Sequence, residues 1–121
     1  AQRIGGTPGQ CTAVGWIDDQ GRVRGGVLFD RCNGRNVLFH GAGDGSGCWP
    51  RALLRAIAHH AFVTLGVERI TTVTQSSNMR ALAWDLAYGF TEEGRMVGAA
   101  HDGSDSVYMV LWKKDCRWLK P

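Results

Sequence analysis

Several features are missing from this 121-residue sequence, and each absence excludes a class of protein. No apolar run approaches the roughly 18 residues that a membrane-spanning helix needs. No charged and then apolar leader opens the chain. We therefore expect no membrane partner, and we expect the protein to reside in the cytoplasm.

Cysteine pairs at metal-ligand spacing are also missing. The four cysteines, Cys11, Cys32, Cys48 and Cys116, lie far apart and show no C-x-x-C spacing. Zinc ligation therefore has little support, and we expect no metal site. Nothing marks a secreted disulfide framework either, which favours reduced thiols in a cytosol.

Clusters of one charge are absent as well. The net charge is +3, with the lysines and arginines scattered along the chain. This balance suits a phosphorylated ligand and makes a nucleic-acid partner unlikely. The apolar share of 44% is ordinary for a globular core. We expect a flexible Gly-rich arm over residues 1–11 and a single domain over residues 12–121.

What is present is an alternation of strand and helix patterns. Strands are predicted over residues 12–19, 22–32, 36–41, 67–74, 91–100 and 106–113. Asn33-Gly34 indicates a tight hairpin, and Gly25-Gly26 suggests a bulge. Residues 50–65 have the spacing of an amphipathic helix that Gly66 ends. The order β-β-β-α-β-α-β-β predicts an α+β domain with a mixed sheet and two helices.

The most informative stretch is the run from Asn78 to Phe90, NMRALAWDLAYGF. Asn78 is a good N-cap and Gly89 a good helix stop. By itself the run could be an ordinary amphipathic helix. Asn, Arg80-Ala81 and the later Gly-Phe together resemble the last conserved block of the GNAT (Gcn5-related) N-acetyltransferases. The element order resembles the GNAT acyl-CoA N-acyltransferase fold from its second strand onward, without the family's opening strand and helical pair.

A narrower resemblance is to short GNAT-like proteins encoded by tailed phages, which would place the protein in a host cytoplasm. It rests on AGDG at residues 42–45, on Trp49, and on CRWL at residues 116–119. The family resemblance implies acetyl-CoA as cosubstrate and an amine acceptor, with Asn78 beside the pantetheine arm. Acetyl-CoA would be attacked directly by the amine, without a covalent enzyme intermediate.

The loop before the first helix is the expected pyrophosphate site. Glycines allow a close backbone approach, and a helix N-terminus attracts phosphate. The family pattern Q/R-x-x-G-x-G/A is altered here, because Gly45, Cys48 and Pro50 stand at its key places. A flexible loop and a solvated helix face are the plain alternatives. The candidate cofactor-binding residues are Gly43, Gly45, Gly47, Cys48, Trp49, Arg51, Arg55 and Asn78.

The catalytic candidates are Tyr88, Asp85 and His40. Family members often carry, seven residues after the Asn, a Tyr that acts as the general acid, and Asp85 stands at that place in this sequence. An ordinary Asp is ionised at neutral pH, so it can act as an acid only if burial raises its pKa. Tyr88 follows by helical spacing, although a packed aromatic is the plainer interpretation. His40, at a strand end, is the best candidate base, although an ordinary surface histidine is an alternative.

The sequence therefore predicts an acetyl-CoA-dependent N-acetyltransferase that acts on a primary amine of a protein, a peptide or a small molecule, and it does not identify which. The alternative is a catalytically inactive GNAT-fold interaction module that modulates a host or partner protein. The altered loop and the missing Tyr favour that alternative. We also expect a homodimer, because the strand over residues 106–113 is apolar on both faces and the family's covering elements are absent.

Overall fold

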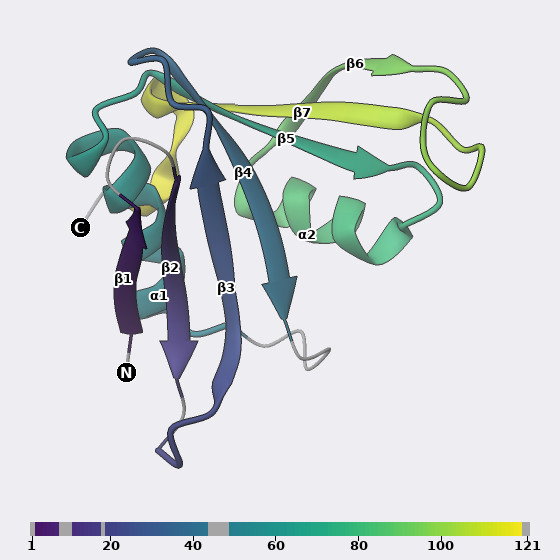
Figure 1. The fold of residues 1–121 in the computed structure, drawn as a ribbon. Helices are drawn as coiled ribbons and strands as arrows, with labels where there is room; N and C mark the ends of the chain where they lie inside the picture. Colours follow the sequence, from purple (N-terminus) through teal and green to yellow (C-terminus); the bar gives the residue numbers. More distant parts are fainter. Residues whose placement is uncertain (1, 8–10, 18, 44–48, 120–121) are drawn as a thin grey trace.

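Seven strands form one mixed sheet in the computed structural model, which describes residues 2–7, 11–17, 19–43 and 49–119 (Figure 1). The sheet order is β1-β2-β3-β4-β5-β7-β6. The strands are β1 (Gln2–Thr7), β2 (Cys11–Ile17), β3 (Val23–Asp30), β4 (Asn36–Gly43), β5 (Arg69–Gln75), β6 (Thr91–Met96) and β7 (Ser106–Trp112). The helices are α1 (Arg51–His59), which continues as a π-helical turn (His60–Thr64), and α2 (Met79–Tyr88). Two short 3₁₀ turns, Lys113–Asp115 and Arg117–Leu119, follow β7.

β1 corrects two expectations from the sequence: a flexible arm over residues 1–11, and the absence of the family's opening strand. Gln2–Thr7 pair antiparallel with β2 along their whole length, from Gln2↔Trp16 to Thr7↔Cys11. A Gly-rich segment can pair in this way because the hydrogen bonds come from the backbone and satisfy the outer edge of β2. The helical pair that the family has after its first strand has no place between β1 and β2, because only residues 8–10 separate these strands.

The start and stop of α2 agree with the sequence signals. The Asn78 side chain accepts a hydrogen bond from the Ala81 N–H at 3.1 Å, which caps the first turn. Gly89 closes the helix at φ 127°, a conformation that disfavours a side chain. Similarly, Gly34 turns the β3–β4 hairpin at φ 91°. The register steps from Trp16↔Gly25 to Ile17↔Val23, so the extra residue of the bulge is Arg24 in β3, next to the Gly25-Gly26 pair at which the sequence predicted it.

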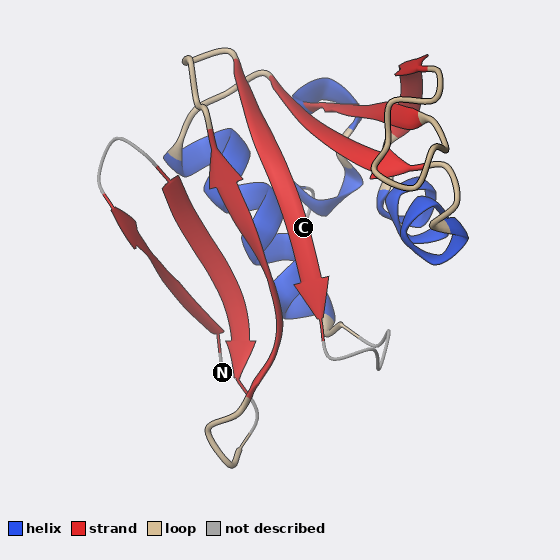
Figure 2. Cartoon of the chain, turned by 45° about the vertical axis from the view of Figure 1, so that its right-hand side comes forward, coloured by secondary structure: helices blue, strands red, loops and turns tan. Residues whose placement is uncertain are grey.

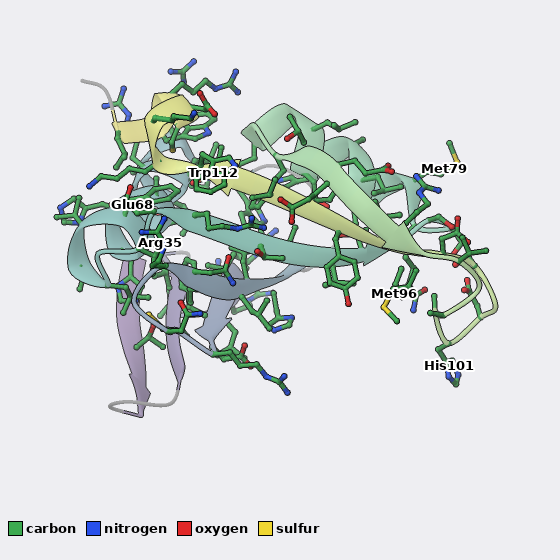
Figure 3. All side chains as sticks on the ribbon, turned by 90° about the horizontal axis from the view of Figure 1, so that it is seen from above. Arg35, Glu68, Met79, Met96, His101 and Trp112 are labelled. Carbon is green, nitrogen blue, oxygen red and sulfur yellow. The ribbon has the colours of Figure 1, made fainter. Side chains whose placement is uncertain are left out.

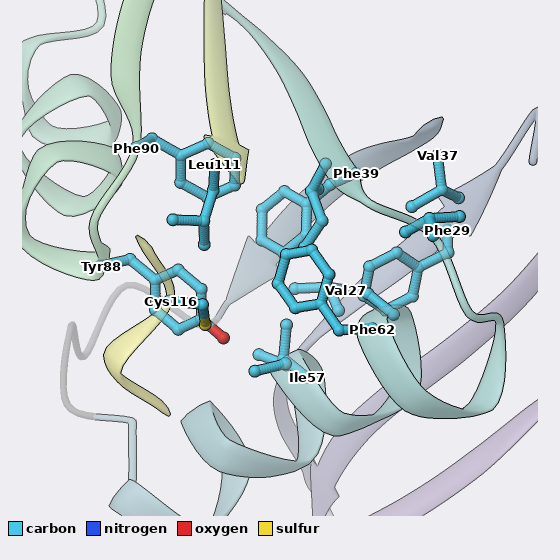
Figure 4. Packing of buried hydrophobic residues seen from close by; sticks show 14 of the residues in the cluster. Val27, Phe29, Val37, Phe39, Ile57, Phe62, Tyr88, Phe90, Leu111 and Cys116 are labelled. Carbon is cyan, nitrogen blue, oxygen red and sulfur yellow. The ribbon is translucent and has the colours of Figure 1, made fainter. Parts of the chain in front are cut away.

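Both helices pack against the same face of the sheet. One continuous core joins Phe29 and Phe39 from the sheet with Ile57 and Phe62 from α1 and its π-helical turn (Figure 4). Tyr88 at the end of α2 belongs to the same core. Figure 2 shows α1 behind the strands of the β1–β4 meander. Burial of these apolar side chains is the main favourable term for folding.

The opposite face of the sheet has no helix over it within the described residues. Figure 3 views the molecule from above, with β6 and β7 running over α2. β7 lies between β5 and β6, and its Val107, Met109 and Leu111 are buried in the core. Tyr108 and Trp112 point to the open face and stay half-buried, so β7 is internal but covered by helices on one side only. Among the described residues, no helix is long and apolar enough to span a membrane.

Candidate active site

The cavity of interest lies where β4 and β5 separate. Among the described strands these are the only parallel neighbours, and they pair at three positions, from Asn36↔Arg69 to Leu38↔Thr71. Beyond these pairs the two strands diverge (Figure 1). A cavity of about 620 Å³ opens there. Its lining comes from β4 (Phe39, His40, Gly41), from Trp49, from β5 (Thr72, Val73, Thr74, Gln75) and from the start of α2 (Asn78, Arg80, Ala81, Trp84, Asp85).

This cavity has walls from both sides of the sheet. Thr72 and Thr74 face α2, together with Trp84 and Asp85. His40 and Val73 lie at alternate positions of their strands and face the open side. The gap therefore connects the helix side to the open side, so that two reactants could meet in it from opposite directions.

One wall depends on a glycine in a neighbouring strand. A Cβ added to Gly25 in β3 would lie 2.7 Å from Nε1 of Trp49, a separation that side chains do not tolerate. The Trp49 indole also meets the Trp84 ring edge-on, with centroids 5.2 Å apart. Trp49 is thus held in the cavity wall by contacts to β3 and α2, which gives this sequence-predicted residue a defined place.

Asp85 is the buried acidic group of the cavity. Only 4% of its surface is exposed, and Oδ2 accepts a hydrogen bond from the Thr74 hydroxyl at 2.7 Å. Burial raises the pKa of Asp85 to about 6, and the Thr74 hydrogen bond opposes part of that rise. A carboxyl group with this pKa is partly protonated near neutral pH, so it can donate a proton.

Tyr88 lies elsewhere, and the structure corrects its assignment as the acid. It is 3% exposed, stacks between Trp84 and Trp118, and is absent from the cavity lining. Figure 4 shows Tyr88 among the buried apolar side chains. Its hydroxyl donates to the Leu54 carbonyl oxygen at 2.7 Å. Burial raises the pKa of Tyr88 far above its ordinary value. Three residues beyond Asp85 on α2, the Tyr88 side chain packs into the core and not into the cavity.

His40 faces the cavity from the open side of the sheet. Its Nε2 lies 3.4 Å from Oδ1 of Asp30 on β3, and that oxygen has no hydrogen-bond partner among the described residues. The register Leu28↔His40 and Asp30↔Leu38 makes the two side chains diagonal neighbours on one face. The cavity thus has a carboxyl group on its helix side and an imidazole on its open side.

The expected cofactor residues are brought together only in part. Asn78 and Trp49 line the cavity, and Gly43 is the last residue of β4. Arg51 and Arg55 are exposed at the start of α1 and do not line it. Gly45, Gly47 and Cys48 lie outside the described residues. In the part of the chain that the structure describes, no cluster of three metal-ligating side chains is found.

The β5 residues of the lining were not predicted from the sequence. Thr72, Val73, Thr74 and Gln75 indicate only a strand, and the place where that strand parts from β4 has no local signal. Arg80 and Trp84 lie in the α2 motif but were not assigned a role. Helical spacing from Asn78 could have placed Trp84 and Asp85 together near the cavity.

No family model matches the sequence, and no curated protein does. Solved structures of the spermidine N-acetyltransferase SpeG from Vibrio cholerae do match the fold. One SpeG variant aligns over 93% of this chain and 70% of its own, with a TM-score of 0.79 and 20% identity. A dodecameric SpeG in an intermediate state has a TM-score of 0.78 and 20% identity, over 93% of this chain and 70% of its own. SpeG in complex with manganese ions has a TM-score of 0.76 and 21% identity, over 88% of this chain and 68% of its own.

These likenesses extend over most of the chain. At about one residue in five identical, they concern the arrangement of the backbone rather than the chemistry of the site. The chain therefore has the same fold as these N-acetyltransferase structures, which is the acyl-CoA N-acyltransferase fold that the resemblance predicted.

Proposed function

We propose that the protein is an acetyl-CoA-dependent N-acetyltransferase that acetylates a primary amine by direct attack on the thioester. The observation that carries the proposal is the cavity at the β4–β5 separation, with Asp85 on one side and His40 on the other. The solved structures that this fold resembles are described as N-acetyltransferases. None of the comparisons favours the inactive interaction module.

The acyl-CoA arm would occupy the gap as a substitute strand. Beyond Leu38 and Thr71, β4 and β5 have no partner on the sides that face each other within the described residues, so backbone N–H and C=O groups there are available. An extended pantetheine chain carries amides that can pair with them, as a peptide adds to a sheet edge. Asn78 lies at the same cavity and closes its end beside the first turn of α2.

The phosphates would lie toward the start of α1. Arg51 and Arg55 are exposed there, one helical turn apart, and the positive end of the helix dipole adds to their attraction for anions. Gly43 and Trp49 flank the loop that leads to this helix. We retain Gly45, Gly47 and Cys48 as candidate contacts from the sequence alone.

The chemistry needs only proton transfers and orientation from the protein. The neutral amine nitrogen attacks the thioester carbon, an N–C bond forms, and the C–S bond breaks to release CoA thiolate. Asp85, protonated in part because of its raised pKa, would give its proton to that thiolate. His40, on the opposite side, would accept the proton that the amine nitrogen loses.

We further propose that two copies associate. The open face of the sheet lacks the helical pair that covers it in the family, and Leu28 is 39% exposed on its β3 side. A second copy could cover part of this face by a self-complementary contact. Trp118 does not contribute to this contact, because its ring stacks on Tyr88 inside the core.

The test of the cofactor is calorimetric titration of the full chain with acetyl-CoA, with CoA as the comparison ligand. We expect saturable binding of both. The Arg51→Ala, Arg55→Ala double variant should bind more weakly and with less dependence on salt concentration. Absence of both heat and thermal stabilisation at millimolar acetyl-CoA would contradict the proposed function and leave the interaction module as the better explanation.

A further inference from the structure

The open face beside the cavity has an apolar surface on the β5 side of the gap. Val73 is 42% exposed and lines the cavity, and it is the direct cross-strand neighbour of Tyr108. The Tyr108 hydroxyl in turn lies 3.3 Å from the sulfur of Met96, which is 54% exposed. These three side chains form a continuous apolar shelf, which Figure 3 locates at the end of the sheet marked by Met96.

Carboxylates near this apolar shelf are already engaged. On the open face, Glu93 accepts two hydrogen bonds from Arg69, at 2.9 and 3.0 Å. Arg69 is fixed in turn by Asn36 and by the ring of Trp112. The remaining carboxylate on the His40 side of the gap is Asp30, which lies against that imidazole.

The carboxylates on the edge strand and the adjoining turn have partners too. Arg95 pairs with Glu92 and with Asp105. Asp102 accepts from the hydroxyls of Ser77 and Ser104. Within the described residues around the shelf, therefore, Glu92, Glu93, Asp102 and Asp105 each have an arginine or hydroxyl partner, and Asp30 lies on the other side of the gap, beside His40.

This distribution decides which amines the face can hold. A polyamine would bring one or two further ammonium groups onto the shelf, away from the reacting nitrogen. An ammonium group that loses water against an apolar surface without a carboxylate partner is strongly disfavoured. An aromatic or branched apolar group in the same place is favoured, because apolar surface leaves water on both sides of the contact.

We propose that the acceptor is a small primary amine attached to an aromatic or branched apolar group, such as an arylalkylamine, and that a polyamine is disfavoured. This inference rests on the proposed function. The amine nitrogen enters the gap beside His40, and its apolar group rests on Val73, Tyr108 and Met96. The spermidine named for the structures with the same fold is thus the comparison substrate rather than the expected one.

The experiment measures thiol release from saturating acetyl-CoA by the full chain, with 2-phenylethylamine or spermidine as acceptor. We expect kcat/KM for 2-phenylethylamine to exceed that for spermidine at least tenfold. Equal values, or a preference for spermidine, would overturn the proposed acceptor class while leaving an N-acetyltransferase in place.

Two variants locate the specificity on the apolar shelf. Val73→Glu and Met96→Glu each add a carboxylate to it, and Met96 lies on an edge strand where a substitution disturbs the fold little. Both should lower kcat/KM for 2-phenylethylamine and raise it for spermidine. Val63→Glu, at a 55% exposed position of the π-helical turn, is the matched control and should leave the ratio unchanged. An unchanged ratio in both shelf variants would overturn the assignment.

A binding measurement separates this inference from the proposed function. Saturation-transfer NMR reports whether each amine contacts the CoA-loaded protein, without any turnover. Contact by 2-phenylethylamine that Val73→Glu abolishes, together with no thiol release, would support the ligand class and contradict catalysis. No contact and no turnover with 2-phenylethylamine would overturn the acceptor class itself.

Discussion

The indole of Trp49 packs directly over Gly25, so that a Cβ at position 25 would lie 2.7 Å from Nε1. Gly25→Ala should displace Trp49 from the cavity wall. Because overpacking costs about 1–3 kcal/mol, the free energy of unfolding should fall by that amount, and acetyl-CoA should bind several-fold more weakly. Urea unfolding and calorimetric titration measure the two effects.

Gly94→Ala is the matched control for Gly25→Ala. No heavy atom lies within 4 Å of a Cβ at Gly94, which is also in a strand and has a negative φ. This variant should change stability by no more than about 0.5 kcal/mol. If both variants bound acetyl-CoA like the wild type, Trp49 would not form part of the cofactor site.

Asp85 should control how turnover depends on pH. If it donates the proton to the thiolate, kcat should fall as the pH rises through about 6, since the protonated acid is then lost. Asp85→Asn should lower kcat by about 100-fold near pH 6 and remove that descending limb, because general acid catalysis contributes at least this much. Steady-state kinetics from pH 5 to pH 9 test this.

Tyr88→Phe gives the contrasting result. It removes the hydrogen bond to the Leu54 carbonyl oxygen, which should lower stability by about 1 kcal/mol and leave kcat unchanged. A large loss of kcat in Tyr88→Phe, with normal turnover in Asp85→Asn, would exchange the roles proposed for these two residues.

Asp85 should also make stability depend on pH. Its pKa is about 6 in the folded chain, whereas a solvated aspartate has a pKa of 3.8, so folding binds a proton between these values. The stabilisation is fully present below pH 3.8 and is lost as the pH rises through 6. Relative to Asp85→Asn, the wild type should therefore be about 1 kcal/mol more stable at pH 5 than at pH 8. Urea unfolding of both proteins at the two pH values tests the sign.

His60 should act in the opposite sense. Burial lowers the pKa of His60 below 6.5, and the nearby His59 lowers it further. Its Nε2 lies 2.7 Å from the Thr12 hydroxyl, while Nδ1 is buried without a hydrogen-bond partner among the described residues. The stability is present above pH 6.5 and is lost as the pH falls below it, because the buried imidazole must then take up a proton.

His60→Gln should therefore lose less stability than the wild type between pH 7 and pH 5. His101→Gln, in the exposed β6–β7 turn, should follow the wild type. Parallel acid-unfolding curves for all three proteins would contradict a neutral, buried His60.

Association of two copies is tested by light scattering or analytical ultracentrifugation at micromolar concentration. A homodimer should have twice the chain mass of 13.2 kDa. Leu28→Lys, which places a charge on the exposed β3 side of the open face, should favour the monomer. A single species near 13 kDa in the wild type would contradict the homodimer.

The sequence by itself determined the local structure, because short-range physics fixes it. Asn78 and Gly89 set the ends of α2, since a side-chain oxygen satisfies a free N–H and a glycine accepts a positive φ. Asn33-Gly34 set the β3–β4 hairpin in the same way. The order of elements from β2 to β7 followed from such signals, and with it the fold.

Only the tertiary structure decided the site. β4 and β5 part after three pairs while each stays paired with its other neighbour, and no residue pattern indicates where that happens. Asp85 and Tyr88 lie on the same helix, yet Asp85 lines the cavity whereas Tyr88 packs in the core. Gly25 and Trp49 meet across 24 positions, and β1 formed because backbone pairing at an edge requires no apolar side chain.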